Sequence, residues 1–130
     1  MNFIDGYLKE ESGELLFMDT HGSLKLNISN HHQIFKEGSI PHKELCVGVR
    51  PEHFSVVSAG EKDSFEVIVR NIQFLGMENV VEFRLKGETE TRHRMMVPPE
   101  VVPKVDDNIS VCLQMEKIHL IDPATEKTLV

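Results

Sequence analysis

The sequence has few of the residues that nucleic-acid recognition requires. Among its 130 residues there is no Trp and a single Tyr, so few aromatic rings are available to stack on bases. Acidic residues outnumber Lys and Arg by 21 to 14, and the net charge of -7 repels a phosphate backbone. Single-stranded nucleic-acid binding, a common use of small β-barrels, is therefore disfavoured.

Cysteines and long apolar runs are also scarce. Cys46 and Cys112 are too few for a disulfide framework, and reduced thiols in a cytoplasmic protein are the simpler interpretation. Both lie between Val and Leu in strand-like segments, which favours packing over reactivity, although the alternation places both on the more polar side. No run approaches the length of a transmembrane helix, and the first residues lack the segments of a signal peptide. We therefore expect a cytoplasmic protein.

The motifs of catalytic and cofactor sites are missing from these residues. The glycines are scattered singly, no Gly-Lys-Ser or Gly-Lys-Thr occurs, and no serine lies in a Gly-x-Ser-x-Gly motif. His31, His32 and His42 could supply metal ligands from a polar stretch, but no His-x-His or Cys-x-x-Cys pair fixes a geometry. A solvated loop is the simpler interpretation. We predict no catalytic residue, no cofactor and no metal in this chain.

Period-two alternation dominates the pattern and predicts β-strands with one wet face. Turn residues separate the segments, and Gly76 is expected to adopt a positive φ or a bulge where two strands meet. Three prolines within residues 97–103 exclude a central strand there and predict a connection crossing a barrel. The chain is expected to be one all-β domain, residues 1–130, folded as an antiparallel barrel or sandwich. The predicted strands are residues 3–8, 14–18, 24–28, 45–50, 65–70 with a possible extension to 75, 81–86, 93–97, 109–115 and 118–121.

One segment interrupts this pattern in an unusual way. The apolar run Val47-Gly48-Val49 reaches Arg50, stops at Pro51-Glu52-His53 and then resumes. Pro51 ends a strand and fixes φ for a tight turn, which brings Arg50 and Glu52 near each other. The two charges could pair, or either could reach across an interface. A charged turn without a partner is the alternative.

This segment resembles a Gly-[Ile/Val]-Arg-Pro-Glu-His motif in the C-terminal domain of ATP-binding-cassette (ABC) importer ATPases. The subunits that serve sugars, glycerol phosphate and polyamines fit best. Residues 1–4, Met-Asn-Phe-Ile, are similar to the start of that domain, just after the nucleotide-binding domain. Residues 74–78 resemble its Leu-Gly-x-Glu corner, and residues 118–125 resemble its closing His-Leu-Phe-Asp-Pro-x-Thr segment. The four matches follow the family's order and extend from residue 1 to about residue 128.

The resemblance implies a transport-associated OB (TOBE) domain, an OB-type antiparallel β-barrel with additional strands that is also similar to molybdate-binding modules. It implies structural or interface roles rather than catalysis for the matched side chains. The implied function is regulation and dimerisation of an importer ATPase, with ATP and Mg bound only in the ATPase domain, which these residues do not contain. The residues so implicated are Arg50, Pro51, Glu52 and His53 at one corner, Gly76 and Glu78 at a second corner, and His119 on the final strand.

The implied partners are a second copy in a homodimer, the subunit's own ATPase domain, the membrane subunits of the importer and a possible regulatory protein. The implied location is the cytoplasmic side of the cell membrane. Met77 departs from the family's small polar residue, and residues 88–94 are unusually charged. Both lie where family members that serve different solutes vary, so the sequence does not indicate which solute is transported. The alternative is a free-standing module that binds a small molecule or oxyanion, which the acidic balance disfavours for anions.

Overall fold

The computed structural model describes residues 1–29, 43–91, 93–125 and 127–128. The all-β prediction is confirmed, and every predicted strand is present; β5, where the apolar run resumes after His53, and β11 were not among the predicted strands. Within these residues, no helix has the length and apolar character needed to cross a membrane. The short 3-10 turns are η2 (Pro51–His53) and η3 (Met115–Lys117). The strands are β1 (Asn2–Glu11), β2 (Glu14–Asp19), β3 (Lys25–Asn27), β4 (Glu44–Val49), β5 (Phe54–Val57), β6 (Phe65–Phe74), β7 (Asn79–Leu85), β8 (His93–Val97), β9 (Asn108–Leu113), β10 (His119–Asp122) and β11 (Lys127–Thr128).

The alternating pattern produces strands with one buried face. In β7, Val81, Phe83 and Leu85 are buried, whereas the residues between them are half-buried. This follows from the two-residue period of a strand, which turns successive side chains to opposite faces. The hydrophobic alternation that was read from the sequence is therefore the inward face of each strand.

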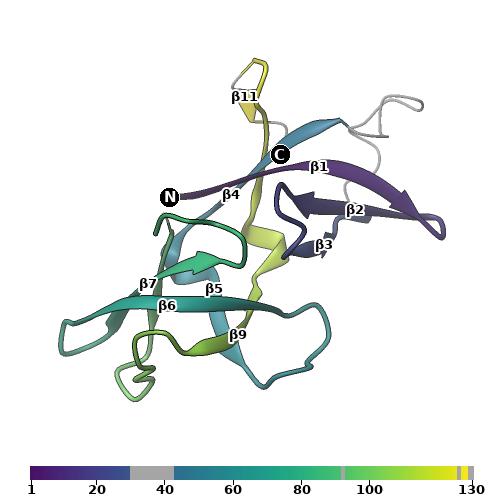
Figure 1. Ribbon diagram of the computed structural model, residues 1–130. Coiled ribbons are helices and arrows are strands. Elements are labelled where there is room, and N and C mark those ends of the chain that lie inside the picture. The colour runs from purple at the N-terminus through teal and green to yellow at the C-terminus, as the bar shows by residue number, and fades with distance from the viewer. Residues whose placement is uncertain (30–42, 92, 126, 129–130) are drawn as a thin grey trace.

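The strands form two antiparallel sheets (Figure 1). One has six strands in the order β11-β10-β4-β1-β2-β3, and the other has five in the order β5-β9-β6-β7-β8. The five-stranded sheet curls until its edge strands β5 and β8 contact each other, and η2 also packs against β8. The rings of Phe54 and Phe83 meet edge to face inside this curl, with centroids 5.4 Å apart. The five-stranded sheet thus closes on itself, and together the two sheets make the OB-like, all-β fold.

Two paired segments belong to both sheets, and we call them the bent ribbon. One segment runs β4-η2-β5 and the other runs β9-η3-β10. β4 pairs with β10, for example Val47 opposite Leu120, and β5 pairs with β9, for example Phe54 opposite Leu113. Both segments bend at the same level, so the ribbon leaves one sheet and enters the other as a pair.

The buried apolar side chains form one continuous core cluster that draws on both sheets. Hydrophobic burial of this kind is the main force holding two layers together. Among the largest fully buried members, Leu8 and Phe17 come from the six-stranded sheet, and Phe83 and Met95 come from the five-stranded sheet.

The connection from β8 to β9 contains the three prolines and forms no strand, as predicted. Since β8 and β9 are separated by β7 and β6 in the sheet, residues 98–107 must pass both of those strands. The side-chain amide of Asn79 holds one end by donating to Pro99 O (3.2 Å) and Val101 O (2.9 Å). The backbone of Val69 holds the other end through bonds with Asp106 N (2.7 Å) and Asp107 O (2.9 Å).

Candidate functional site

The segment from Arg50 to His53 forms the corner of the bent ribbon. β4 ends at Val49, Pro51 opens η2, and β5 begins at Phe54. Arg50 has φ -75 and ψ 148, the extended conformation that suits a residue before proline. The amide of His53 donates to Arg50 O at 3.0 Å and closes the turn. The predicted turn is confirmed, and it moves the chain from one sheet to the other.

The side chains of this corner contribute little to holding it. Arg50 and Glu52 are exposed, whereas Pro51 and His53 are half-buried. Arg50 and Glu52 do not pair with each other, and neither forms an ion pair elsewhere in the described part of the chain. The pairing that the sequence suggested is therefore not formed. Two opposite charges instead stand in solvent on a turn fixed by proline and backbone bonds.

His119 lies beside this corner on the second segment of the bent ribbon. It begins β10 opposite Gly48, and its side chain is half-buried. The preceding turn, η3, contains no Gly or Pro, and its Lys117 amide donates to Gln114 O at 2.9 Å. The Gln114 amide in turn donates to His53 O at 3.0 Å, so the two corners are joined directly. The sequence predicted a break between two strands here but not a change of sheet.

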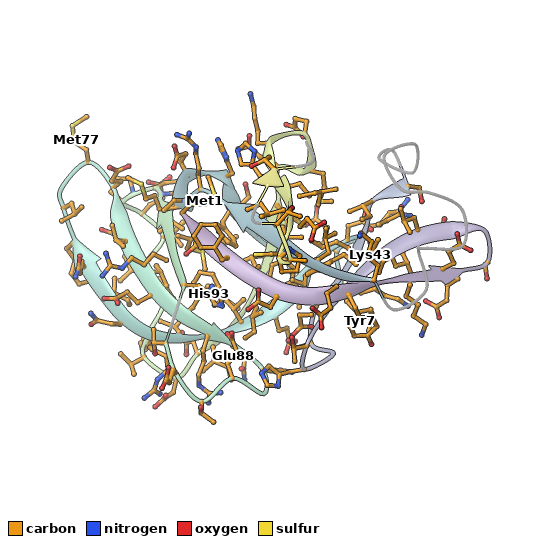
Figure 2. The ribbon with its side chains drawn as sticks, turned by 90° about the horizontal axis from the view of Figure 1, so that it is seen from above. Met1, Tyr7, Lys43, Met77, Glu88 and His93 are labelled. Atoms are coloured by element: carbon orange, nitrogen blue, oxygen red, sulfur yellow. The ribbon has the colours of Figure 1, made fainter. Side chains whose placement is uncertain are left out.

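Gly76 and Glu78 lie elsewhere, at the turn between β6 and β7. Gly76 has φ +91, which confirms the predicted positive φ and explains why glycine occupies this position. The amide of Leu75 donates to Glu78 O at 3.0 Å, so the backbone of Glu78 closes the turn. Figure 2 shows the neighbouring Met77 at the outer end of this hairpin, far from Tyr7 and Lys43. The structure thus brings His119 to the first corner but not these two residues.

Asn2 is a buried link between the sheets that sequence reasoning missed. Its amide nitrogen donates to Val49 O (3.0 Å) and Arg94 O (2.8 Å), and its amide oxygen accepts from Arg94 N (2.6 Å). The side chain is 4% exposed, and these bonds join β1 to β4 and, across the sheets, to β8. Its inward position in the alternation was the only sequence signal. A satisfied buried amide of this kind fixes the orientation of one sheet on the other.

A second missed pair is Glu88 with His93, labelled in Figure 2. The ring nitrogen Nε2 of His93 lies 3.0 and 3.1 Å from the two carboxylate oxygens of Glu88, which accept a hydrogen bond from it. Glu88 Oε1 also accepts from the amide of Leu85 at 2.7 Å. His93 is 2% exposed, and its Nδ1 has no partner among the described residues. The pair fastens the turn between β7 and β8, so the charge noted there in the sequence is structural.

Two hollows of the surface have acidic linings, whereas two others contain Lys25 and Lys86 beside carboxylates. The larger, about 670 Å³, includes Asp5, Tyr7 and Glu44, and a smaller one of about 210 Å³ includes Asp19 and Glu88. Within the described residues neither lining contains Lys or Arg, so neither attracts an anion.

A metal centre finds no support in the part of the chain that the structure describes. No group of three His, Cys, Asp or Glu side chains is arranged there to hold an ion. His31, His32 and His42, the residues considered as ligands, lie outside the described residues.

The two thiols are free and poorly ionised. Cys46 is buried, and burial, with Asp5 as a neighbouring negative charge and hydrogen-bond partner, raises its pKa to about 11. Burial also raises the pKa of Cys112, with Glu61 and Asp63 adding to the effect. Since the thiolate is the reactive form, the raised pKa values disfavour reactivity, and the half-burial of Cys112 agrees with its place on the more polar side of the alternation.

Two family models match successive parts of the chain. Residues 1–54 match the MalK OB fold domain, and residues 47–121 match the TOBE domain. The overlap, residues 47–54, contains the end of β4, η2 and the first residue of β5. The two matches therefore meet at the corner where the chain changes sheet.

Curated relatives are ATP-binding subunits of transporters. The sulfoquinovosyl glycerol transport ATP-binding protein SmoE of Agrobacterium fabrum is 30% identical over 94 residues, 72% of this chain and 25% of SmoE. The ABC transporter ATP-binding protein YurJ of Bacillus subtilis is 27% identical over 135 aligned positions, 99% of this chain and 35% of YurJ. The sn-glycerol-3-phosphate import ATP-binding protein UgpC of Vibrio vulnificus is 25% identical over 93 residues, 67% of this chain and 25% of UgpC. The chain thus spans between a quarter and about a third of the length of these relatives.

One solved structure shares nearly the whole fold. The cytoplasmic molybdate-binding protein ModG, crystallised with molybdate bound, superposes with a TM-score of 0.65 over 92% of this chain and 94% of that one. The two sequences are 18% identical, so the likeness concerns the fold.

Proposed function

Because this chain belongs to the TOBE domain family, we propose that it serves as the C-terminal regulatory and dimerisation domain of an ABC importer's ATP-binding subunit. The observation that carries this proposal is the order of the two family matches. The MalK OB fold domain comes first and the TOBE domain second, and they overlap at the corner of the bent ribbon. A fold likeness alone would not favour a transporter over any other use of an OB barrel.

The proposed cargo is a sugar or a related solute. SmoE and UgpC are named for the transport of sulfoquinovosyl glycerol and sn-glycerol-3-phosphate, which are a glycoside and a phosphorylated polyol. Cargo recognition in such a system belongs to other parts of the importer, so this domain is proposed to act on the subunit rather than on the solute. Its proposed partners are a second copy, the subunit's own ATPase domain, the importer's membrane subunits and a regulatory protein, at the cytoplasmic face of the membrane.

The domain is proposed to have no catalytic activity of its own. The 130 residues contain no phosphate-binding loop, and ATP and Mg are expected in the ATPase domain of the whole subunit. The corner offers Arg50 and Glu52 as exposed opposite charges that have no partner among the described residues, which suits contacts with a neighbouring domain. Such rim charges set orientation and selectivity more than affinity.

The test is to find the native protein with an antibody raised against this chain. Because the chain corresponds to 35% of YurJ, the proposal expects a band at about three times the mass of this chain. The protein purified through that antibody should hydrolyse ATP, whereas the 130-residue chain alone should not. A band at the mass of the chain itself, or ATP hydrolysis by the isolated chain, would contradict the proposal.

A free-standing oxyanion-binding module is the second candidate, and the fold of ModG is the observation that favours it. Two hollows have acidic linings that repel an anion, and the lysines of two others, Lys25 and Lys86, are paired with Glu11 and Glu66, which argues against anion binding. Titration calorimetry with molybdate, sulfate and phosphate separates the candidates. The importer proposal expects no heat of binding from any of them, and saturable heat would support the second candidate.

A further inference from the structure

Most of the exposed large apolar side chains lie at one end of the five-stranded sheet. Figure 1 shows the β6–β7 turn and the connection after β8 at this end, and the Asn79 bonds tie the two together. Each of the five side chains is more than half exposed. We call this set the apolar end: Phe74 (65%), Leu75 (58%), Met77 (91%), Val102 (56%) and Val105 (53%).

The size of the apolar end matches one half of a stable protein interface. A Phe side chain alone can bury roughly 150–250 Å², so these five side chains present on the order of 500 Å² of apolar surface. Interfaces are only about 57% apolar, so this corresponds to about 900 Å² per partner when the polar surroundings are included. That exceeds the roughly 800 Å² per partner of a standard specific interface.

The connection gives this surface a charge pattern that fits its own copy. Glu100, Val102 and Lys104 are exposed, whereas Val101 is half-buried against the core and Pro103 is buried. The three exposed residues therefore stand at alternate positions of this segment, with an acid, an apolar residue and a base in succession. Neither Glu100 nor Lys104 forms an ion pair within the described part of the chain.

If two such segments pack antiparallel about a two-fold axis at Val102, each of the three exposed side chains gains a partner. Glu100 of each copy then faces Lys104 of the other, and the two Val102 side chains meet at the axis. A two-fold interface requires this self-complementarity, because the same patch serves both subunits. The turn beside it is held by the Leu75–Glu78 backbone bond, so its backbone needs little ordering on association.

We propose that two copies of this chain associate through the apolar end, with residues 100–104 of the two copies antiparallel across the two-fold axis. This inference rests on the dimerising part of the proposed function and assigns it a surface. It places the contact away from the Arg50–His53 corner, which stays available for another domain.

The decisive experiment is a charge swap followed by sedimentation equilibrium over a concentration series of the chain. Lys104→Glu and Glu100→Lys should each weaken the dimer at least about tenfold, because each creates two like-charge contacts in a symmetric pair. The double variant should return the dissociation constant to within about threefold of the wild type, since it restores both pairs. Lys62→Glu, an exposed change in the turn before β6, is the matched control and should have no effect.

A second variant tests the apolar part and guards against misfolding. Met77→Ser should weaken association by at least about tenfold, while Phe3→Ser, a 56% exposed side chain on β1, should not. Circular dichroism should show all variants folded. A monomer at every concentration, a double swap that restores nothing, or equal loss from Phe3→Ser would overturn the proposal. Binding of the apolar end to phosphatidylcholine–phosphatidylserine vesicles instead would also overturn it.

The result is separable from the test of the importer function. If the antibody detects a threefold larger ATPase but the charge swap has no effect, only the proposed surface is wrong. If the band runs at the mass of this chain and the swap behaves as expected, the surface stands and the importer role fails.

Discussion

The corner of the bent ribbon and the turn between β6 and β7 are both interruptions between strands, but they are built in opposite ways. At the corner, charged residues stand in solvent while Phe54 directly after them is 4% exposed and packs on Phe83. At the turn, Phe74 and Met77 are 65% and 91% exposed, and backbone alone closes the loop. The corner therefore places an aromatic side chain in the core, whereas the turn leaves apolar side chains in solvent.

The largest expected effect separates the two phenylalanines that adjoin these features. Phe54→Ala should lower the free energy of unfolding by about 3–4 kcal/mol, because it removes a buried ring and leaves a cavity beside Phe83. Phe74→Ala should change it by less than about 0.5 kcal/mol, since that ring is already in solvent. Urea unfolding followed by circular dichroism measures both. Equal losses would show that the turn supports the core after all.

An intermediate effect is expected from the backbone of the β6–β7 turn. Gly76→Ala should cost about 1–2 kcal/mol, because φ of +91 is unfavourable for any residue with a Cβ atom. No neighbouring atom lies within 4 Å of the added methyl, so the cost is purely conformational. Met77→Ala in the same turn is the control and should be nearly neutral in urea unfolding. A neutral Gly76→Ala would mean that the turn can adopt another conformation.

An effect confined to alkaline pH tests whether water reaches the thiol of Cys46 in the bent ribbon. Its folded-state pKa of about 11 lies above the unfolded value of 9.0, so the folded state holds the proton more tightly. The contribution of this thiol to the free energy of unfolding is fully present below pH 9 and is lost as the pH rises from 9 to 11. Wild type should therefore lose stability faster than Cys46→Ala across that window. Parallel curves would show that solvent reaches the thiol.

The smallest change in stability is expected at the charges of the corner. Arg50→Ala and Glu52→Gln should each alter the free energy of unfolding by less than about 0.5 kcal/mol, because neither side chain is buried or paired in the described chain. In the full-length subunit identified with the antibody, the same variants should reduce ATP hydrolysis or its coupling to transport. Lys62→Glu is the control there. Unchanged activity would leave the corner a purely structural turn.

Sequence alone predicted the strands well because their physical signal is local. Alternation with period two appears directly in segments such as residues 81–86, and the turns between them carry glycine. The change of sheet at Pro51 was not predicted, because the alternation looks the same in either sheet. β11 was missed because two residues are too few to show a period.

The candidate sites were less accessible to sequence reasoning because they depend on distant neighbours. Arg94, whose backbone Asn2 binds, is 92 positions away along the chain. The pairing of Glu88 with His93 depends on a turn whose conformation the charges alone do not specify. The exposure of Phe74 was also unforeseen, because an aromatic residue at the end of an alternating strand is normally expected to face inward.

The bent ribbon has a consequence for how the chain reaches its folded state. Its pairs join residues far apart in the sequence, as when Val47 lies opposite Leu120. β9 lies between β5 and β6, so β5 cannot join its sheet before residues 108–113 are present, and β10 adds to the free edge of β4. Closing such long loops before any gain in pairing makes folding slow, and the high contact order places this chain among the millisecond-to-second folders. During synthesis β5 and the outer edge of β4 would therefore stay unpaired until β9 and β10 have emerged from the ribosome.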